Sequence, residues 1–176
     1  MRPGAGMRRA IMLAMALEPR ESELTLPEGL EAGLLGGFSV AAVYLIHDLL
    51  QGDWLYTPRV LGSLLYAGPD AASMTAVDPL AADAGVAPLY HIVHFAVWTA
   101  AGFAAAALMR AAERRPALRF FPVLLLAIFV ACFFALDAEV EAANIARLHL
   151  WAGGLAGAAA LTGYLLWRHP SVLRAV

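Results

Sequence analysis

The sequence predicts an all-α integral membrane protein, a four-helix bundle with a short interfacial helix in its first outer loop. Of the 176 residues, 61% are hydrophobic and only 15% are charged, whereas about one-quarter of the residues of soluble domains are charged. The chain also contains four apolar stretches of the length that crosses a bilayer at a helical rise of about 1.5 Å per residue. Finally, its cations are all arginines, and they are grouped along the chain.

We expect the four membrane spans at residues 31–51, 88–109, 118–136 and 148–167. They divide the chain into an N-terminal tail or surface helix (1–27), a transmembrane domain (28–170) and a C-terminal tail (171–176). Thr25 and Glu28 form a capping box with Pro27 between them, which predicts that the first span begins there. Residues 7–17 superficially resemble a signal peptide, but the apolar run is only about eight residues long.

The arginines predict the orientation of the chain. Ten of them precede the first span, lie between the second and third, or follow the fourth, and only Arg59 and Arg147 lie on the other side. Cytoplasmic loops carry such an excess of arginine, so both termini and the central loop should be cytoplasmic. Seven acidic residues then lie on the outer side: Asp53, Asp70, Asp78, Asp83, Asp137, Glu139 and Glu141.

The outer loop, residues 52–87, has two halves of different character. In the first half, Thr57 can cap a short helix that starts at Pro58 and ends at Gly68 and Pro69. Its leucines and valine share one face, so we expect this helix to lie along the outer membrane surface. The second half, Asp70 to Ala87, is rich in Ala, Asp, Gly and Pro and is typical of an irregular connector.

Small residues in the spans predict close helix packing, because they let helix backbones approach one another in lipid. The glycines concerned are Gly33, Gly36, Gly37, Gly102, Gly153, Gly154 and Gly157. Gly153 and Gly157 have the GxxxG spacing, which we interpret as packing within the chain rather than dimerisation. Cys132, the single cysteine, lies in a span, so neither an intramolecular disulfide nor a CxxC metal site can form.

The candidate functional residues form one layer. His47, His91, His94 and His149 each fall within about 10 Å of the outer boundary when residues are counted from the helix ends. His91 and His94 are three apart and share a helix face. If the third helix continues past Leu136, Asp137 and Glu141 share a face as well. In contrast, we interpret His169, beside Arg168, as helix-terminal charge, and Arg147 as a partner of Glu141 or Asp137.

Three interpretations of this layer remain open, because ionisable groups near hydrocarbon must pair, bind a metal or line a wet cavity. In the first, His91 and His94, with His47 or His149 and a carboxylate, bind zinc, copper or iron, or two histidines hold a haem. In the second, the imidazoles only tie helix ends together through hydrogen bonds. In the third, they line a path for protons or substrate.

No catalytic motif is present, and the absence of lysine excludes Schiff-base chemistry by a side chain. Nothing indicates nucleic-acid binding. We therefore expect a non-enzymatic integral membrane protein, a subunit or scaffold, whose partners are the bilayer and either other membrane subunits or further copies of itself. The alternatives are a metal- or haem-binding membrane redox component and a small proton-linked transporter. No cofactor is certain.

The sequence Tyr56-Thr57-Pro58, followed by Leu61-Gly62, lies between a span ending in an aspartate and a span opening with paired histidines. This pattern resembles a recurrent type of uncharacterised bacterial four-span integral membrane protein. The resemblance covers most of residues 29–170. It implies the same topology in a bacterial inner membrane and implies no catalytic or binding residue.

Overall fold

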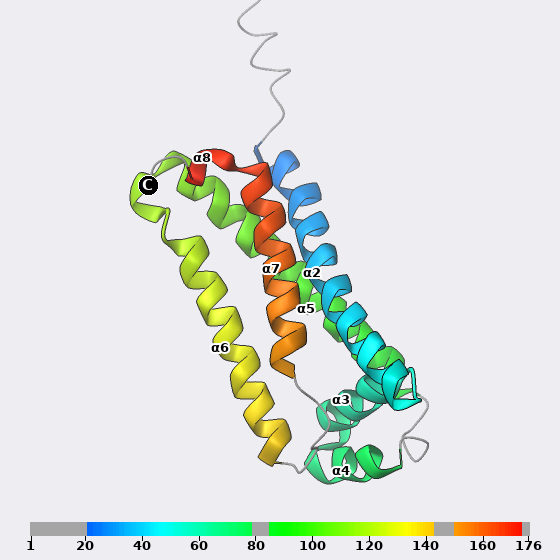
Figure 1. Cartoon of the computed structure of the whole chain (residues 1–176). Helices are drawn as coiled ribbons and strands as arrows, with labels where there is room; N and C mark the ends of the chain where they lie inside the picture. Colours follow the sequence, from blue (N-terminus) through cyan, green and yellow to red (C-terminus); the bar gives the residue numbers. More distant parts are fainter. Residues whose placement is uncertain (1–20, 79–84, 143–149, 174–176) are drawn as a thin grey trace, which may run out of the picture.

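The computed structural model describes residues 21–78, 85–142 and 150–173, which are helical apart from short connections and contain no strand (Figure 1). This confirms the predicted all-α class. The helices are α2 (Glu21–Gln51), α3 (Tyr56–Ala67), α4 (Pro69–Val77), α5 (Val86–Arg114), the 3₁₀ turn η2 (Pro116–Leu118), α6 (Phe121–Ala142), α7 (Leu150–Arg168) and α8 (Pro170–Leu173).

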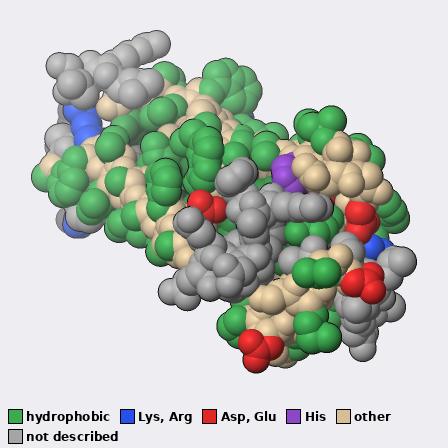
Figure 2. Space-filling model, turned by 60° about the horizontal axis from the view of Figure 1, so that its bottom comes forward, with side chains coloured by type: hydrophobic (Ala, Val, Ile, Leu, Met, Phe, Trp, Pro, Cys, Tyr) green, Lys and Arg blue, Asp and Glu red, His purple; other side chains and the backbone are tan. Residues whose placement is uncertain are grey.

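Three of these helices are long and apolar enough to cross a membrane: Leu26–Gln51 within α2, Val86–Arg114, and Leu150–Arg168. The remaining long helix, α6, contains the shorter apolar segment Val123–Ala138. Large hydrophobic side chains lie exposed on all four helices. Hydrophobic side chains are spread over the described part of the face seen in Figure 2, and acidic side chains lie toward the end formed by α3 and α4. The surface is therefore suited to lipid.

The long helices pack in the order α5, α2, α7 and α6. Helix α2 lies along both α5 and α7, while α6 packs mainly against the side of α7 that faces away from α2 (Figure 1). Helices α3 and α4 pack together at one end of the molecule, and α3 also packs on α5. The 3₁₀ turn and α8 lie at the opposite end (Figure 1). We call these the α3–α4 end and the α8 end.

Glycines allow the long helices to approach closely, as predicted. A β-carbon at Gly102 of α5 would overlap the backbone of Gly29 and Gly33 in α2. Likewise, one at Gly153 would collide with the ring of Tyr44, and one at Gly157 with Trp98. The GxxxG spacing in α7 is thus used for packing within the chain.

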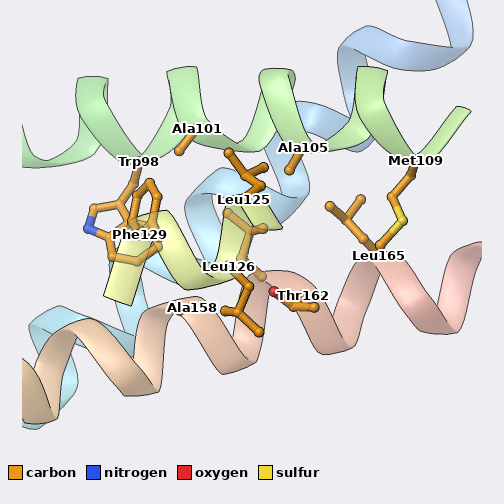
Figure 3. A pocket seen from close by; sticks show the side chains of 11 residues that line it. Trp98, Ala101, Ala105, Met109, Leu125, Leu126, Phe129, Ala158, Thr162 and Leu165 are labelled. Atoms are coloured by element: carbon orange, nitrogen blue, oxygen red, sulfur yellow. The ribbon is translucent and has the colours of Figure 1, made fainter. Parts of the chain in front are cut away.

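A small cavity of about 30 Å³ lies between α5, α6 and α7 (Figure 3). Apart from Thr162, its wall is apolar. Trp98 of α5 lies at one end of it, with its ring centroid 4.9 Å from that of Phe129 in α6. Met109 and Leu165 lie at the other end (Figure 3), and both are almost fully buried. The contact between Phe129 and Trp98 therefore joins α6 to the core.

The first helix begins earlier than the capping box predicts. Helix α2 starts at Glu21, and Pro27 lies inside it. Glu21 and Glu23 are acidic, and acidic residues favour a helix N-terminus through the helix dipole, so the preceding turn is itself compatible with a helix. At the other end, α8 extends the chain as a helix to Leu173. Residues 1–20 and 174–176 lie outside the described part.

The outer loop is more ordered than predicted. Helix α4 occupies Pro69–Val77, where the composition predicts an irregular connector. Pro69 takes the first turn and Asp70 follows it, which are both favourable at a helix N-terminus. Helix α3 packs closely on the start of α5: a β-carbon at Gly62 would collide with the backbone of Val86, so only glycine permits this approach. One side of α3 is therefore covered by protein.

Candidate functional site at the α3–α4 end

Asp48 connects the end of α2 to the beginning of α3. Its side chain is 1% exposed. The Thr57 backbone N–H donates a hydrogen bond to Oδ2 at 2.8 Å, and the Thr57 hydroxyl donates to Oδ1 at 2.6 Å. The first backbone N–H groups of a helix have no partner within the helix, and a carboxylate there also interacts well with the helix dipole. Asp48, rather than Thr57, thus caps α3.

His47 is the nearest group to Asp48 that can be charged. Its Nδ1 lies 3.3 Å from Asp48 Oδ1, and its side chain is 29% exposed. On the same end of the molecule, Arg59 donates to both oxygens of Asp53, at 3.0 and 3.2 Å. Pairing with Asp53 accounts for an arginine at the end where the sequence predicts few.

The two histidines of α5 are held by backbone carbonyls. His91 Nδ1 donates to the Ala87 carbonyl at 2.7 Å within its own helix. His94 Nε2 donates to the Gly37 carbonyl of α2 at 3.0 Å. A carbonyl oxygen can only accept a hydrogen bond, so in the neutral ring the second nitrogen of each histidine is an acceptor. His94 therefore ties α5 to α2.

These side chains surround a cavity of about 250 Å³ between α2, α3 and α5. The Tyr90 ring lies against both histidines, with centroid distances of 5.8 Å to His91 and 5.6 Å to His94. On the other side, the Tyr44 hydroxyl donates to the Leu150 carbonyl at 3.1 Å. The described wall consists of Ala41, Tyr44, Leu45, Asp48, Trp54, Leu55, Pro58, Tyr90, His91 and His94. Most of the wall is apolar, and its ionisable groups come from α2 (Asp48) and α5 (His91 and His94).

The described residues of the predicted metal site each contact a different partner. His91 and His94 bind backbone carbonyls, and His47 lies beside Asp48. Asp137 Oδ1 accepts the backbone N–H of Leu150 at 2.7 Å, which holds the start of α7 to α6. No three His, Cys, Asp or Glu side chains meet in a metal-binding arrangement among the described residues. Because His149 and the Glu141 side chain lie outside them, as does Arg147, the metal hypothesis stays a prediction.

A second polar cluster, at the α8 end, was not predicted. Glu28 of α2 is 2% exposed, and it accepts hydrogen bonds from Arg110 at 2.5 Å and from His169 Nε2 at 2.6 Å. His169 Nδ1 lies 3.0 Å from Glu113 of α5. Ser171 of α8 also donates to Glu113, at 2.6 Å. His169 lies at the end of α7, as predicted, but it is buried and links α7 to α2 and α5, which the interpretation as helix-terminal charge did not include.

One signal in the sequence indicates this cluster. Glu28 and Arg110 carry opposite charges near the ends of two apolar segments, and ionisable residues near hydrocarbon usually pair. The first and second spans run in opposite directions, so the start of one meets the end of the other. The pairing of Glu28 with Arg110 could therefore have been predicted from the sequence. It was missed because Glu28 was placed at the edge of the membrane domain.

The fold defines the class of the protein: the described residues form an all-helical structure with three helices capable of crossing a membrane. No family model, curated protein or solved structure matches the chain.

Proposed function

We propose that the chain is a four-span integral membrane protein of the bacterial inner membrane, with both termini cytoplasmic, that acts as a non-enzymatic subunit or scaffold. The α8 end then faces the cytoplasm, and the α3–α4 end faces outward. Three membrane-capable helices support the membrane location. The arginines of the α5–α6 connection support the orientation.

Helix α6 is proposed as the fourth span. It has 22 residues, which correspond to about 33 Å of helix, close to the thickness of a hydrocarbon core. Large apolar side chains along it are exposed, among them Val123, Ile128, Phe134 and Leu136. In water such a face would be costly, whereas lipid or a partner helix covers it without penalty.

The observation that supports a scaffold most directly is the use of the buried polar groups. His94 binds a backbone carbonyl of α2, Asp137 binds the first described N–H of α7, and Glu28 joins α2 to α5 and α7. Each of these groups fixes one helix against another. Satisfied polar networks make a bundle rigid and specific, which is the property expected of a scaffold.

Cysteine labelling tests the topology. In a Cys132→Ser background, Met74→Cys places a thiol on the exposed side of α4, where Met74 is 68% exposed. Arg115→Cys places one just beyond α5. We expect a membrane-impermeant maleimide to label Met74→Cys in intact spheroplasts and Arg115→Cys only after the membrane is opened. The reverse pattern would overturn the proposed orientation.

The subunit role has a separate test. After extraction in a mild detergent, we expect the protein to migrate well above the 18.7 kDa of one chain, with the detergent contribution subtracted. A second polypeptide in fixed ratio would identify a partner subunit, and a single polypeptide would identify a homo-oligomer. A protein that is monomeric in native membranes, by cross-linking as well as by mass, would contradict the subunit role.

A second candidate function, a small proton-linked transporter, is favoured by one observation. The cavity at the α3–α4 end brings Asp48, His91 and His94 to a common wall, and ionisable groups at such a depth often serve transport. In proteoliposomes, this candidate predicts a flux that depends on the proton gradient and is lost in His94→Ala. A flux equal to that of empty liposomes would count against it.

A further inference from the structure

We propose that the cavity at the α3–α4 end is a binding site for a lipophilic organic cation, an amine or quaternary ammonium ion with an apolar body. This inference goes beyond the subunit or scaffold role, and it names a class of substrate for the transporter candidate. It depends on the cavity itself and not on the orientation of the chain in the membrane.

The charge of the wall favours a cation. Asp48 reaches the cavity, and its side chain is buried. Its described partners are the neutral N–H and O–H groups of Thr57 and the partly exposed ring of His47. No arginine is among the described lining residues, and the chain has no lysine. A buried carboxylate without a permanent cationic partner attracts a positive ligand strongly, because the surroundings screen it weakly.

The hydrogen-bonding groups on the wall favour a donor or a cation as well. The protons on His91 Nδ1 and His94 Nε2 are already given to carbonyl oxygens. The Tyr44 hydroxyl proton is given to the Leu150 carbonyl. What these groups still offer are lone pairs, together with those of the Asp48 carboxylate. Among the described lining side chains, the Tyr90 hydroxyl and the Trp54 indole N–H are donors as well. An anionic ligand would nevertheless meet the negative charge of the buried Asp48 carboxylate, and this charge selects against it.

Aromatic rings supply the remaining recognition. Tyr44, Tyr90 and Trp54 line the cavity, and rings of this kind attract ammonium groups through their electron-rich faces. Such attraction reaches cations without N–H groups, so it extends the proposed class to quaternary ions. Trp54 lines the cavity and is 62% exposed, so its fluorescence can respond to a bound ligand.

The shape of the cavity fits an amphiphile. A second cavity, of about 400 Å³, is also lined by Tyr44, Tyr90 and His94, and it extends between α2, α3, α5, α6 and α7. Its other described lining residues are all apolar: Val40, Leu61, Leu64, Leu65, Val93, Val97, Trp98, Phe133, Leu136 and Leu150. Ligand sites typically have volumes of about 300–1,000 Å³. The cationic group would thus lie near Asp48 and the apolar body in the second cavity.

The test measures binding to the purified full chain in a nonionic detergent, by Trp fluorescence and by equilibrium dialysis. The probes are tetraphenylphosphonium, the smaller cation benzyltrimethylammonium, and tetraphenylborate, which has the shape of the first probe and the opposite charge. We expect saturable binding of at least one cation, with at least tenfold higher affinity than for the borate. Equal affinity for the borate, or no saturable binding of either cation, would overturn the proposal.

Asp48→Asn identifies the site, because it removes the charge but keeps the size of the side chain. We expect at least a tenfold loss of cation affinity in this variant. The matched control is Asp70→Asn, which removes one negative charge from the same end of the molecule without touching the cavity wall. Wild-type affinity in Asp48→Asn, or an equal loss in both variants, would overturn the assignment of the site.

A further variant covers the case in which Asp48→Asn does not fold. Ala41→Phe fills the cavity from α2, whereas Ala96→Phe adds the same ring at an exposed position of α5. We expect the first to abolish cation binding and the second to leave it within twofold of wild type. Binding that survives Ala41→Phe would overturn the proposal. These assays do not report topology or oligomeric state, so they fail independently of the proposed function.

Discussion

The imidazole of His169 lies between two carboxylates: Nε2 is 2.6 Å from Glu28 Oε1 of α2, and Nδ1 is 3.0 Å from Glu113 Oε2 of α5. A neutral imidazole has one N–H, so it can donate to only one of them, whereas an imidazolium donates to both. With Arg110 also bound to Glu28, opposite charges surround each member of the cluster. The cluster joins helices that are far apart in the sequence.

His169→Ala should therefore destabilise the fold strongly. The substitution removes the hydrogen bond from His169 to the buried Glu28 carboxylate, which keeps only its contact with the arginines, at a cost of about 1–3 kcal/mol or more because Glu28 is charged. Arg168→Ala is the control, because its Nε lies 3.9 Å from Glu28 and its side chain is 49% exposed, and we expect a loss below about 1 kcal/mol. Unfolding by SDS in mixed micelles, followed by circular dichroism, measures both. Losses of equal size would show that burial of the His169 cluster does not matter.

The long helices could be predicted because their signal is continuous. Apolar stretches identify α2, α5, α6 and α7, and the small residues in them correctly indicate close packing. The bounds of α2 were less accessible, since Pro27 and the Thr25–Glu28 pattern favour a start where the chain is already helical. Local capping preferences are worth about 1 kcal/mol, which the surrounding turns can outweigh.

The polar contacts were harder to predict, because their geometry depends on tertiary packing. In the structure, His91 and His94 line one cavity with Asp48, and His47 lies beside Asp48. The sequence does not indicate that His94 binds the Gly37 carbonyl, since a backbone acceptor leaves no mark in the sequence. The contact of Asp48 with Thr57 was missed for another reason. Threonine before proline is typical of a helix cap, so Thr57 was interpreted as the cap, whereas the Asp48 carboxylate caps the helix.

Thr57→Val tests how much the Thr57 hydroxyl contributes to stability, because valine has nearly the same shape but no hydroxyl. The substitution keeps the volume of this fully buried side chain but removes its hydrogen bond to Asp48 Oδ1, which then has only the longer contact with His47 Nδ1 at 3.3 Å. Loss of a hydrogen bond to a buried charged acceptor costs about 1–3 kcal/mol, and we expect a loss of that size in thermal unfolding. Thr57→Ser restores the hydroxyl and should recover most of it. A serine variant as unstable as the valine variant would contradict this role.

The metal hypothesis can be decided on purified protein. We expect neither a Soret band nor stoichiometric zinc, copper or iron, because no three His, Cys, Asp or Glu side chains converge among the described residues and Asp137 binds the start of α7. Absorbance spectroscopy and elemental analysis measure the two properties. A stoichiometric metal that is lost in both His94→Ala and His149→Ala would contradict this expectation and establish the predicted site.

Gly102 provides a test of helix packing with a control in the same bundle. A β-carbon there would overlap the backbone of Gly29 and Gly33, and neither backbone can yield without moving α2 from α5. Gly102→Ala should therefore destabilise the protein by at least about 1–3 kcal/mol, the usual cost of overpacking. Gly163 of α7 has open space around it, so Gly163→Ala should gain about 0.5–1 kcal/mol from helix propensity alone. Unfolding in mixed micelles measures both changes, and a stabilising Gly102→Ala would mean that α2 and α5 are not in backbone contact.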